Sequence, residues 1–169
     1  MRDRAVAAAR RNPTRHELVE RIEQLIAEYN ADSLNIEEII RRLIALSRDL
    51  SAEEQRGVVE GMSEEELAVF DLLTKPDPVL SDEELEQVKG VAKRLLAHVH
   101  EKLVLDWRRK AETMADVRVT IRDVLDELPA APYPRTVYDA KVQLVYDHVL
   151  TVYGDDGTSV YEEPAVSVG

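Results

Sequence analysis

The sequence contains no cysteine, and this absence removes several classes of chemistry together. Without a thiol the chain has no disulfide framework, no thiolate zinc site, no iron–sulfur cluster and no cysteine nucleophile. Aromatic residues are scarce, with one Phe, one Trp and six Tyr, so a stacking platform for single-stranded nucleic acid is not expected. The six glycines never approach the GxxxxGKS or GxGxxG spacing. A loop that cradles the phosphates of ATP or a dinucleotide is therefore not predicted.

Long hydrophobic runs and an export signal are missing as well. No apolar stretch approaches the ~20 residues that span a bilayer. The arginine-rich start lacks the hydrophobic segment of a secretion signal. We therefore expect a cytoplasmic protein without membrane contact. Its 169 residues, 44% hydrophobic and 33% charged, suit one domain or a small pair of helical lobes with charged surfaces.

Positive charge is in deficit and unevenly placed. The chain has 22 lysines and arginines against 34 aspartates and glutamates, a net charge of −12, which argues against a protein that wraps a large phosphate surface. The first 15 residues hold five arginines and one aspartate, so a basic start precedes an acidic body. Residues 1–13 are predicted to be a solvated basic N-terminal arm.

Local start and stop signals divide the rest of the chain into helices. Capping boxes begin at Thr14, Ser63 and Ser81, where a hydroxyl accepts a free amide and a glutamate three residues later reaches back. Asp106 and Thr136 are predicted to cap two further helices. Apolar residues recur behind each signal at the 3.6-residue period of one helix face. The expected helices cover about residues 14–30, 36–60, 63–75, 81–103, 106–128 and 136–153.

These elements predict an all-α fold. No strand is convincing and no unit of about 20 to 50 residues repeats. We expect an antiparallel helical bundle of about six helices over residues 14–153. Phe70 and Trp107, the lone phenyl and indole rings, are predicted core anchors. Residues 154–169 contain turn residues without a period, which predicts a flexible C-terminal tail that is disordered or is ordered by a partner.

The titratable residues form no recognisable active site. His98 and His100 lie two positions apart on a helix and point in nearly opposite directions, so they cannot share a metal ion, and no HExxH motif is present. Glutamates cluster in first helical turns, where they complement the helix dipole. His148 lies on the apolar side of the last helix, either as a hydrogen-bonded residue at the core edge or as the base of a small metal-independent enzyme. No catalytic, cofactor-binding or metal-ligating residue is assigned.

One short motif has the composition of a contact site. Arg108, Arg109 and Lys110 place three cations beside Trp107, and arginine offers a bidentate fork to phosphates or carboxylates. We call these three residues the basic strip and predict that it contacts a partner protein or a phosphate. The alternative interpretation is a buried tryptophan with solvated neighbours.

Six segments carry a further signal: Asn12-Pro13-Thr14-Arg15, Ala27-Glu28-Tyr29-Asn30, Ser63 to Pro78, Val88 to Lys93, Leu103 to Lys110 and Val145 to Val149. Together they resemble the C-terminal helical domain of the R (restriction and motor) subunit of type I restriction endonucleases. The resemblance extends over about residues 12–153 in the right order. It is specific for a helical domain, although no matching segment is catalytic.

The resemblance implies an assembly domain and not a whole enzyme. In that family the full-length R subunit is an ATP-dependent DNA translocase and a type I site-specific deoxyribonuclease, and its nuclease and motor domains lie upstream. The helical domain helps dock the motor subunit onto the methyltransferase core, which consists of modification and specificity subunits. ATP and magnesium are expected only in the parent's motor and nuclease domains, with no cofactor in this chain, and DNA is reached only through the complex. Residues 1–13 can also be the end of a connecting helix from the motor.

The sequence leaves two origins and two rival functions open. The chain is either an excised domain or a stand-alone protein. The first rival function is a free-standing acidic helical adaptor or DNA-mimic inhibitor, which the net charge of −12 suggests. The second is a small metal-independent enzyme that uses His148.

Overall fold

The computed structural model describes residues 1–156 and 158–162, and within them the chain is helical. The helices are α1 (Arg2–Arg11), α2 (His16–Asn30), α3 (Ile36–Glu60), α4 (Glu64–Thr74), α5 (Asp82–Lys102), α6 (Ala111–Leu125) and α7 (Arg135–Val152). Two 3-10 turns, η1 (Pro13–Arg15) and η2 (Trp107–Arg109), precede α2 and α6. The predicted all-α helical bundle is confirmed, and α1 adds a helix to the six that were expected.

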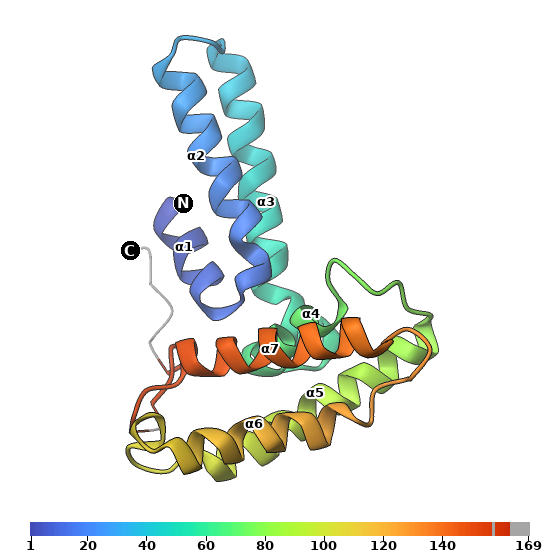
Figure 1. Ribbon diagram of the computed structural model, residues 1–169. Helices are drawn as coiled ribbons and strands as arrows, with labels where there is room; N and C mark the ends of the chain where they lie inside the picture. Colours follow the sequence, from blue (N-terminus) through green and yellow to red (C-terminus); the bar gives the residue numbers. More distant parts are fainter. Residues whose placement is uncertain (157, 163–169) are drawn as a thin grey trace.

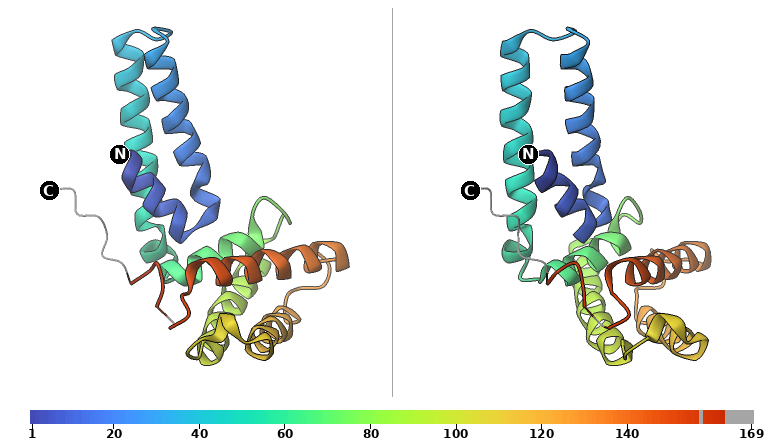
Figure 2. Two further views of the ribbon diagram at one scale, coloured as in Figure 1. Left: turned by 60° about the vertical axis from the view of Figure 1, so that its left-hand side comes forward. Right: turned by 90° about the vertical axis from the view of Figure 1, so that its left-hand side faces the viewer.

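The helices form two lobes with separate cores. Figure 1 shows α2 and α3 as an antiparallel hairpin that projects from a body made of α4, α5, α6 and α7, and Figure 2 shows the same projection from two other sides. The body contains a large cluster of buried side chains that includes both predicted anchors, Phe70 and Trp107. The hairpin lobe, α1 to α3, has its own smaller cluster, built from small and aliphatic residues such as Ala5, Leu18 and Leu50.

Two of the three predicted capping boxes are present. The Ser63 hydroxyl accepts the Glu66 amide at 3.1 Å, and the Ser81 hydroxyl accepts the Glu84 amide at 3.2 Å. The glutamate carboxylates accept the serine amides in return. The predicted stop of α3 is also confirmed, because Gly61 adopts the left-handed backbone, with φ 66°, that favours glycine.

The three other predicted N-caps are wrong. The Thr14 hydroxyl does not cap α2; it donates to the Asn12 carboxamide oxygen at 2.8 Å and approaches Asp71 at 3.3 Å, while Asn12 itself caps the 3-10 turn. Asp106 has a left-handed backbone and makes no side-chain cap. Thr136 lies inside α7, which begins one residue earlier after Pro134. In each case a turn precedes the helix and shifts the residue at which the helix begins. The spacing of residues in the sequence does not predict such a turn.

The apolar stripe of α3 is buried in the inner half of the helix and exposed in the outer half. Leu46 and Leu50 are covered by the hairpin lobe, whereas Ile36, Ile40 and Ile44 are about half exposed or more. The physical reason is the projection of the hairpin, since the outer half of α3 has only α2 as a neighbour. Periodicity therefore located the helix correctly without showing how much of its apolar face is covered.

Part of the predicted C-terminal tail is described, and it contacts the body. Tyr153 forms an isolated antiparallel bridge with Ser159, and the Gly154 amide donates to the Thr158 carbonyl at 2.7 Å. Val160 and Tyr161 pack against the large core. Residue 157 and residues 163–169 of the predicted tail lie outside the described residues. No described helix is long and apolar enough to cross a membrane.

Candidate functional site

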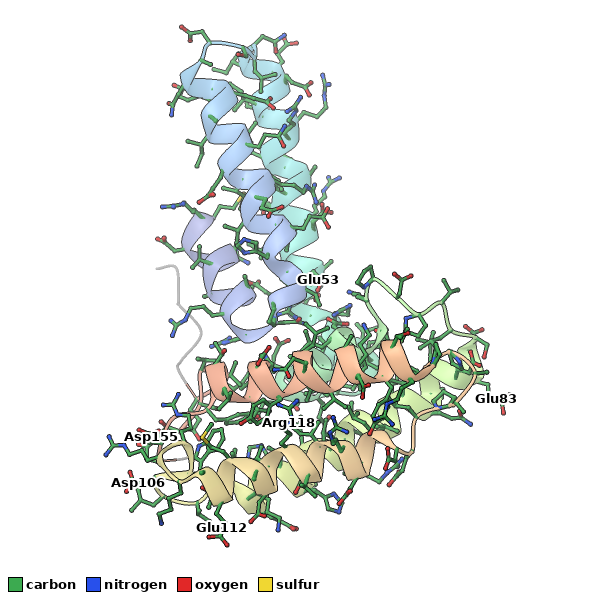
Figure 3. All side chains as sticks on the ribbon, in the orientation of Figure 1. Glu53, Glu83, Asp106, Glu112, Arg118 and Asp155 are labelled. Carbon is green, nitrogen blue, oxygen red and sulfur yellow. The ribbon has the colours of Figure 1, made fainter. Side chains whose placement is uncertain are left out.

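The predicted contact motif lies where η2 meets the C-terminal segment. Trp107 is fully buried, and its indole Nε1 donates to the Gly154 carbonyl at 2.9 Å. The backbone amide of Asp106 donates to the Asp155 carbonyl at 2.7 Å. Figure 3 shows Asp106 and Asp155 together at this end of the body. The tryptophan thus holds η2 against the segment that follows α7, although the two lie 47 residues apart in the sequence.

The basic strip is partly neutralised inside the molecule. Arg108 donates from Nε to the Asp155 carboxylate at 2.8 Å and from Nη1 to the Leu150 carbonyl at 3.1 Å. Arg109 lies 3.4 Å from the same Asp155 carboxylate but keeps 72% of its side chain exposed. Lys110 is exposed at the start of α6. Arg109 and Lys110 therefore remain accessible, while Arg108 holds the C-terminal segment.

Sequence reasoning missed Asp155, the partner of this strip. It is 47 residues from Arg108, so helix periodicity cannot pair the two. The available signal was compositional: an acidic pair follows the glycine that ends the last helix, opposite in charge to the strip. With Asp155 in place, the strip can still offer Arg109 and Lys110 to a carboxylate or a phosphate.

A buried polar network joins the two lobes, and we call it the joint: Asn12, Arg15, Arg56 and Asp71. The Asp71 side chain has no solvent exposure, and its Oδ2 accepts from Asn12 Nδ2 at 2.6 Å and from Arg56 Nη2. Asp71 lies on α4, Asn12 lies between α1 and η1, and Arg56 lies on α3. One carboxylate therefore ties three segments together.

Arg15 forms the second half of the joint. Its side chain is almost completely buried and donates to Glu64 of α4 at 2.7 Å and to Glu53 of α3 at 3.3 Å. Glu53 is labelled in Figure 3 at the base of the hairpin. Burial by itself would lower the pKa of Arg15, but hydrogen bonds and the charges of the two glutamates raise it above its usual value. Nothing local in the sequence marks these residues, because their partners lie 38 to 49 residues away.

His148 lies in a cluster of tyrosines and histidines under the C-terminal segment. Its Nε2 is 3.0 Å from the Tyr161 hydroxyl, which donates to the Arg11 carbonyl at 2.5 Å. Burial lowers the pKa of His148 to about 4. Nearby, Glu65 accepts from His100 at 2.8 Å and from the Tyr153 hydroxyl at 2.5 Å. The hydrogen bond to Glu65 raises the pKa of His100, and the same bond lowers the pKa of Glu65.

These contacts favour the core-edge interpretation of His148. A buried imidazole that is neutral at pH 7 and bonded to a tyrosine fits a residue that stabilises packing. Across residues 1–156 and 158–162, no group of three His, Asp or Glu side chains could hold a metal ion.

Comparison with known protein families gives one match to a family model. The family described as type I restriction enzyme HindI endonuclease subunit-like, C-terminal, matches residues 1–154. That range includes the hairpin lobe, the body and the basic strip.

Two curated relatives agree with this match. A protein of Methanocaldococcus jannaschii named as a type I restriction enzyme MjaIXP endonuclease subunit is 27% identical over 119 residues, which cover 68% of this chain and 11% of that protein. The type I restriction enzyme HindI endonuclease subunit of Haemophilus influenzae is 24% identical over 115 residues, which cover 66% of this chain and 11% of that protein. The chain thus matches about a ninth of the length of these relatives. No solved structure matches it.

Proposed function

The chain belongs to the family of C-terminal regions of HindI-like type I restriction endonuclease subunits, and we propose that it is an assembly domain. In this proposal it helps dock the motor subunit of a type I restriction enzyme onto the methyltransferase core of modification and specificity subunits. DNA is then reached through the assembled complex and not through this domain alone.

One observation supports docking in particular. The projecting hairpin keeps large apolar side chains in solvent, with Tyr29 60% and Ile36 72% exposed. Ile26, Tyr29 and Leu43 line one hollow of the hairpin, and contiguous apolar surface marks sites where proteins meet, whereas scattered single residues do not. The body, which contains the larger core, anchors the hairpin through the joint and holds it away from other elements.

The same proposal assigns the chemical steps to other parts of the parent subunit. ATP and magnesium are used in motor and nuclease domains, and this chain contributes binding. Purified alone, it is expected neither to hydrolyse ATP nor to cut DNA, with or without magnesium. Activity that survived purification and disappeared on substitution of a residue of this chain would contradict the assignment.

The decisive experiment measures binding of the isolated chain to a purified core of modification and specificity subunits from the same restriction system. Isothermal titration calorimetry is expected to show saturable binding at a defined stoichiometry. The rival function, a DNA-mimic inhibitor, predicts instead that the chain displaces DNA from the core. Absence of binding to the core would remove the docking proposal.

A further inference from the structure

An apolar groove runs along one face of the projecting hairpin. Its volume is about 360 Å³. The floor comes from Ile22 and Leu25, which are buried, and the sides include Ile26, Tyr29 and Leu43, which are exposed. We call this surface the hairpin groove. It opens to solvent although its lining is almost entirely hydrocarbon.

The apolar surface of the groove continues along α3. On α3 the residues Ile36, Ile39, Ile40 and Leu43 follow the i, i+3, i+4, i+7 spacing of one helix face, so the groove side extends toward the hairpin tip. A second hollow on the hairpin, which we call the mixed hollow, is lined by Arg21, Gln24 and Arg42 together with Leu25, Ala45 and Leu46. The groove has the more apolar lining of the two hollows, so a partner that covers apolar surface meets the groove side.

Helix α1 already covers the part of the α2–α3 surface that adjoins the hairpin groove. Its Ala5 and Ala8 are buried in the hairpin core, while Arg2 reaches Glu23 of α2 at 3.1 Å and Arg4 reaches Glu54 of α3 at 2.6 Å. In Figure 2 the N-terminal end of α1 faces the hairpin tip, and Met1 and Arg2 line the hairpin groove. The groove thus continues the surface against which α1 packs, and α1 is itself a helix with an apolar stripe and flanking arginines.

The charge of the hairpin favours the same chemistry in a partner. Residues 16–60 contain eleven acidic residues and five arginines, a net charge of −6. Basic side chains beside an apolar stripe would find glutamates on both helices, as the two arginines of α1 do. An acidic partner would meet like charge, which costs free energy at an interface.

We propose that the hairpin groove binds an amphipathic α-helix of the methyltransferase core, with an apolar stripe flanked by lysines or arginines. The helix lies as a third helix against α2 and α3, in line with α1. Exposed Ile26, Tyr29 and Leu43 insert between its apolar side chains. This inference rests on the proposed docking function and assigns that function a surface and a partner chemistry.

The test compares two double substitutions that add the same charge to opposite sides of the hairpin. Ile26→Glu with Leu43→Glu places two carboxylates in the groove, and Gln24→Glu with Ala45→Glu places two on the mixed hollow. All four side chains are exposed, so both variants are expected to keep the melting temperature. In calorimetric titration with the modification and specificity subunits, the groove variant is expected to bind at least ~10-fold more weakly and the control to bind like the wild type.

The outcomes separate this inference from the docking proposal. If the wild-type chain does not bind the core, both are wrong. If the wild type binds and the groove variant binds equally well, docking stands and the groove assignment is overturned. Light scattering on the chain alone tests the other occupant: a dimer that the groove substitutions convert to a monomer would show that a second copy fills the groove and would also overturn the assignment. If the groove variant unfolds, Tyr29→Glu replaces it, since that side chain is 60% exposed.

Discussion

At the scale of single residues, Asp71 holds a negative charge where no solvent reaches it. Asn12, at 2.6 Å, and the Arg56 guanidinium reach it from other segments, and Lys75 at the end of α4 lies 3.6 Å from its second oxygen. Removing one member of such a buried set leaves the others without compensation, which is far more costly than losing a surface pair. The stability of the joint therefore depends on a carboxylate that the sequence presents as an ordinary acidic residue of α4.

Asp71→Asn is expected to lower the free energy of unfolding by about 3 kcal/mol, because the partly buried Arg56 then keeps only its longer contact with Glu53, at 3.4 Å. Urea unfolding followed by circular dichroism measures the change. Glu54→Gln is the control: its ion pair with Arg4 is solvent-accessible, so the loss should be at most about 1 kcal/mol. Equal losses in the two variants would show that the joint is no stronger than a surface contact.

A second residue, His148, is expected to make the free energy of unfolding depend on pH. Burial lowers its pKa to about 4 in the folded chain, against about 6.5 when unfolded. Between those values the unfolded state binds a proton that the folded state does not, so stability is lost as the pH falls from 6.5 toward 4. The contribution at stake is about 3 kcal/mol.

His148→Gln should flatten this part of the stability curve, because glutamine does not titrate and can still bond to Tyr161. Chemical unfolding of both proteins at pH 4.5, 5.5, 6.5 and 7.5, roughly spanning the two pKa values, gives the difference curve. Glu65 and His100 titrate nearby in both proteins, so their contributions largely cancel in that difference. Parallel curves would mean that His148 is solvated in the folded chain.

At the scale of elements, the capping boxes are local devices with a measurable effect. Ser81→Ala removes the acceptor for the Glu84 amide at the start of α5 and should cost about 1 kcal/mol of unfolding free energy. Ser33→Ala, in the exposed turn between α2 and α3, has only a weak 3.4 Å contact to Ala31 and should change stability much less. Thermal and urea unfolding compare them. A cap substitution as harmless as the turn substitution would contradict the reciprocal hydrogen bonds at Ser81.

The elements that the sequence predicted well are those whose signals are local. The boxes at Ser63 and Ser81 and the stop at Gly61 involve atoms within a few residues, so composition and spacing suffice. Thr14 has the same spacing signal, yet its hydroxyl faces Asn12 and Asp71, and the second of these is 57 residues away. Local patterns cannot rank such a long-range partner above a cap.

The same limit applies to the candidate site. Trp107 could be predicted as an anchor, because a lone indole beside an apolar run is costly to expose. Its hydrogen bond to Gly154, and the pairing of Arg108 with Asp155, depend on how the C-terminal segment returns to η2. The hairpin groove depends on which apolar stripe lacks a neighbour, and helical periodicity is the same for covered and uncovered stripes.

At the scale of the whole molecule, the parts that stabilise the fold are separate from the surfaces proposed to contact a partner. The body and the joint hold the chain together, and the hairpin extends apolar surface away from them (Figure 1). The basic strip, the second surface predicted to contact a partner, lies in the body, where Arg109 and Lys110 remain exposed near Asp155. A docking domain with two separated contacts can combine an apolar anchor with charged groups at the rim.

The basic strip therefore needs to be tested without disturbing its internal role. Arg108→Glu would set a carboxylate against Asp155 and remove the bond to the Leu150 carbonyl, so a lower melting temperature is expected. Arg109→Glu with Lys110→Glu alters the accessible charges, and the surface pairs of Arg109 contribute little to stability. Arg109→Glu also brings a carboxylate near Asp155, but the side chain is 72% exposed and can turn into solvent, so this double variant should lower the melting temperature much less than Arg108→Glu.

If the strip docks the chain, the Arg109→Glu, Lys110→Glu variant should weaken assembly with the modification subunit, most clearly at low salt, where rim charges are least screened. If the strip instead meets the phosphates of translocating DNA, assembly should stay intact. DNA binding by the complex should then fall and depend less steeply on salt, because fewer counterions are released. Titrations at two salt concentrations distinguish these results. A folded variant with wild-type assembly and wild-type DNA binding at low salt would exclude the strip from both contacts and leave docking to the hairpin.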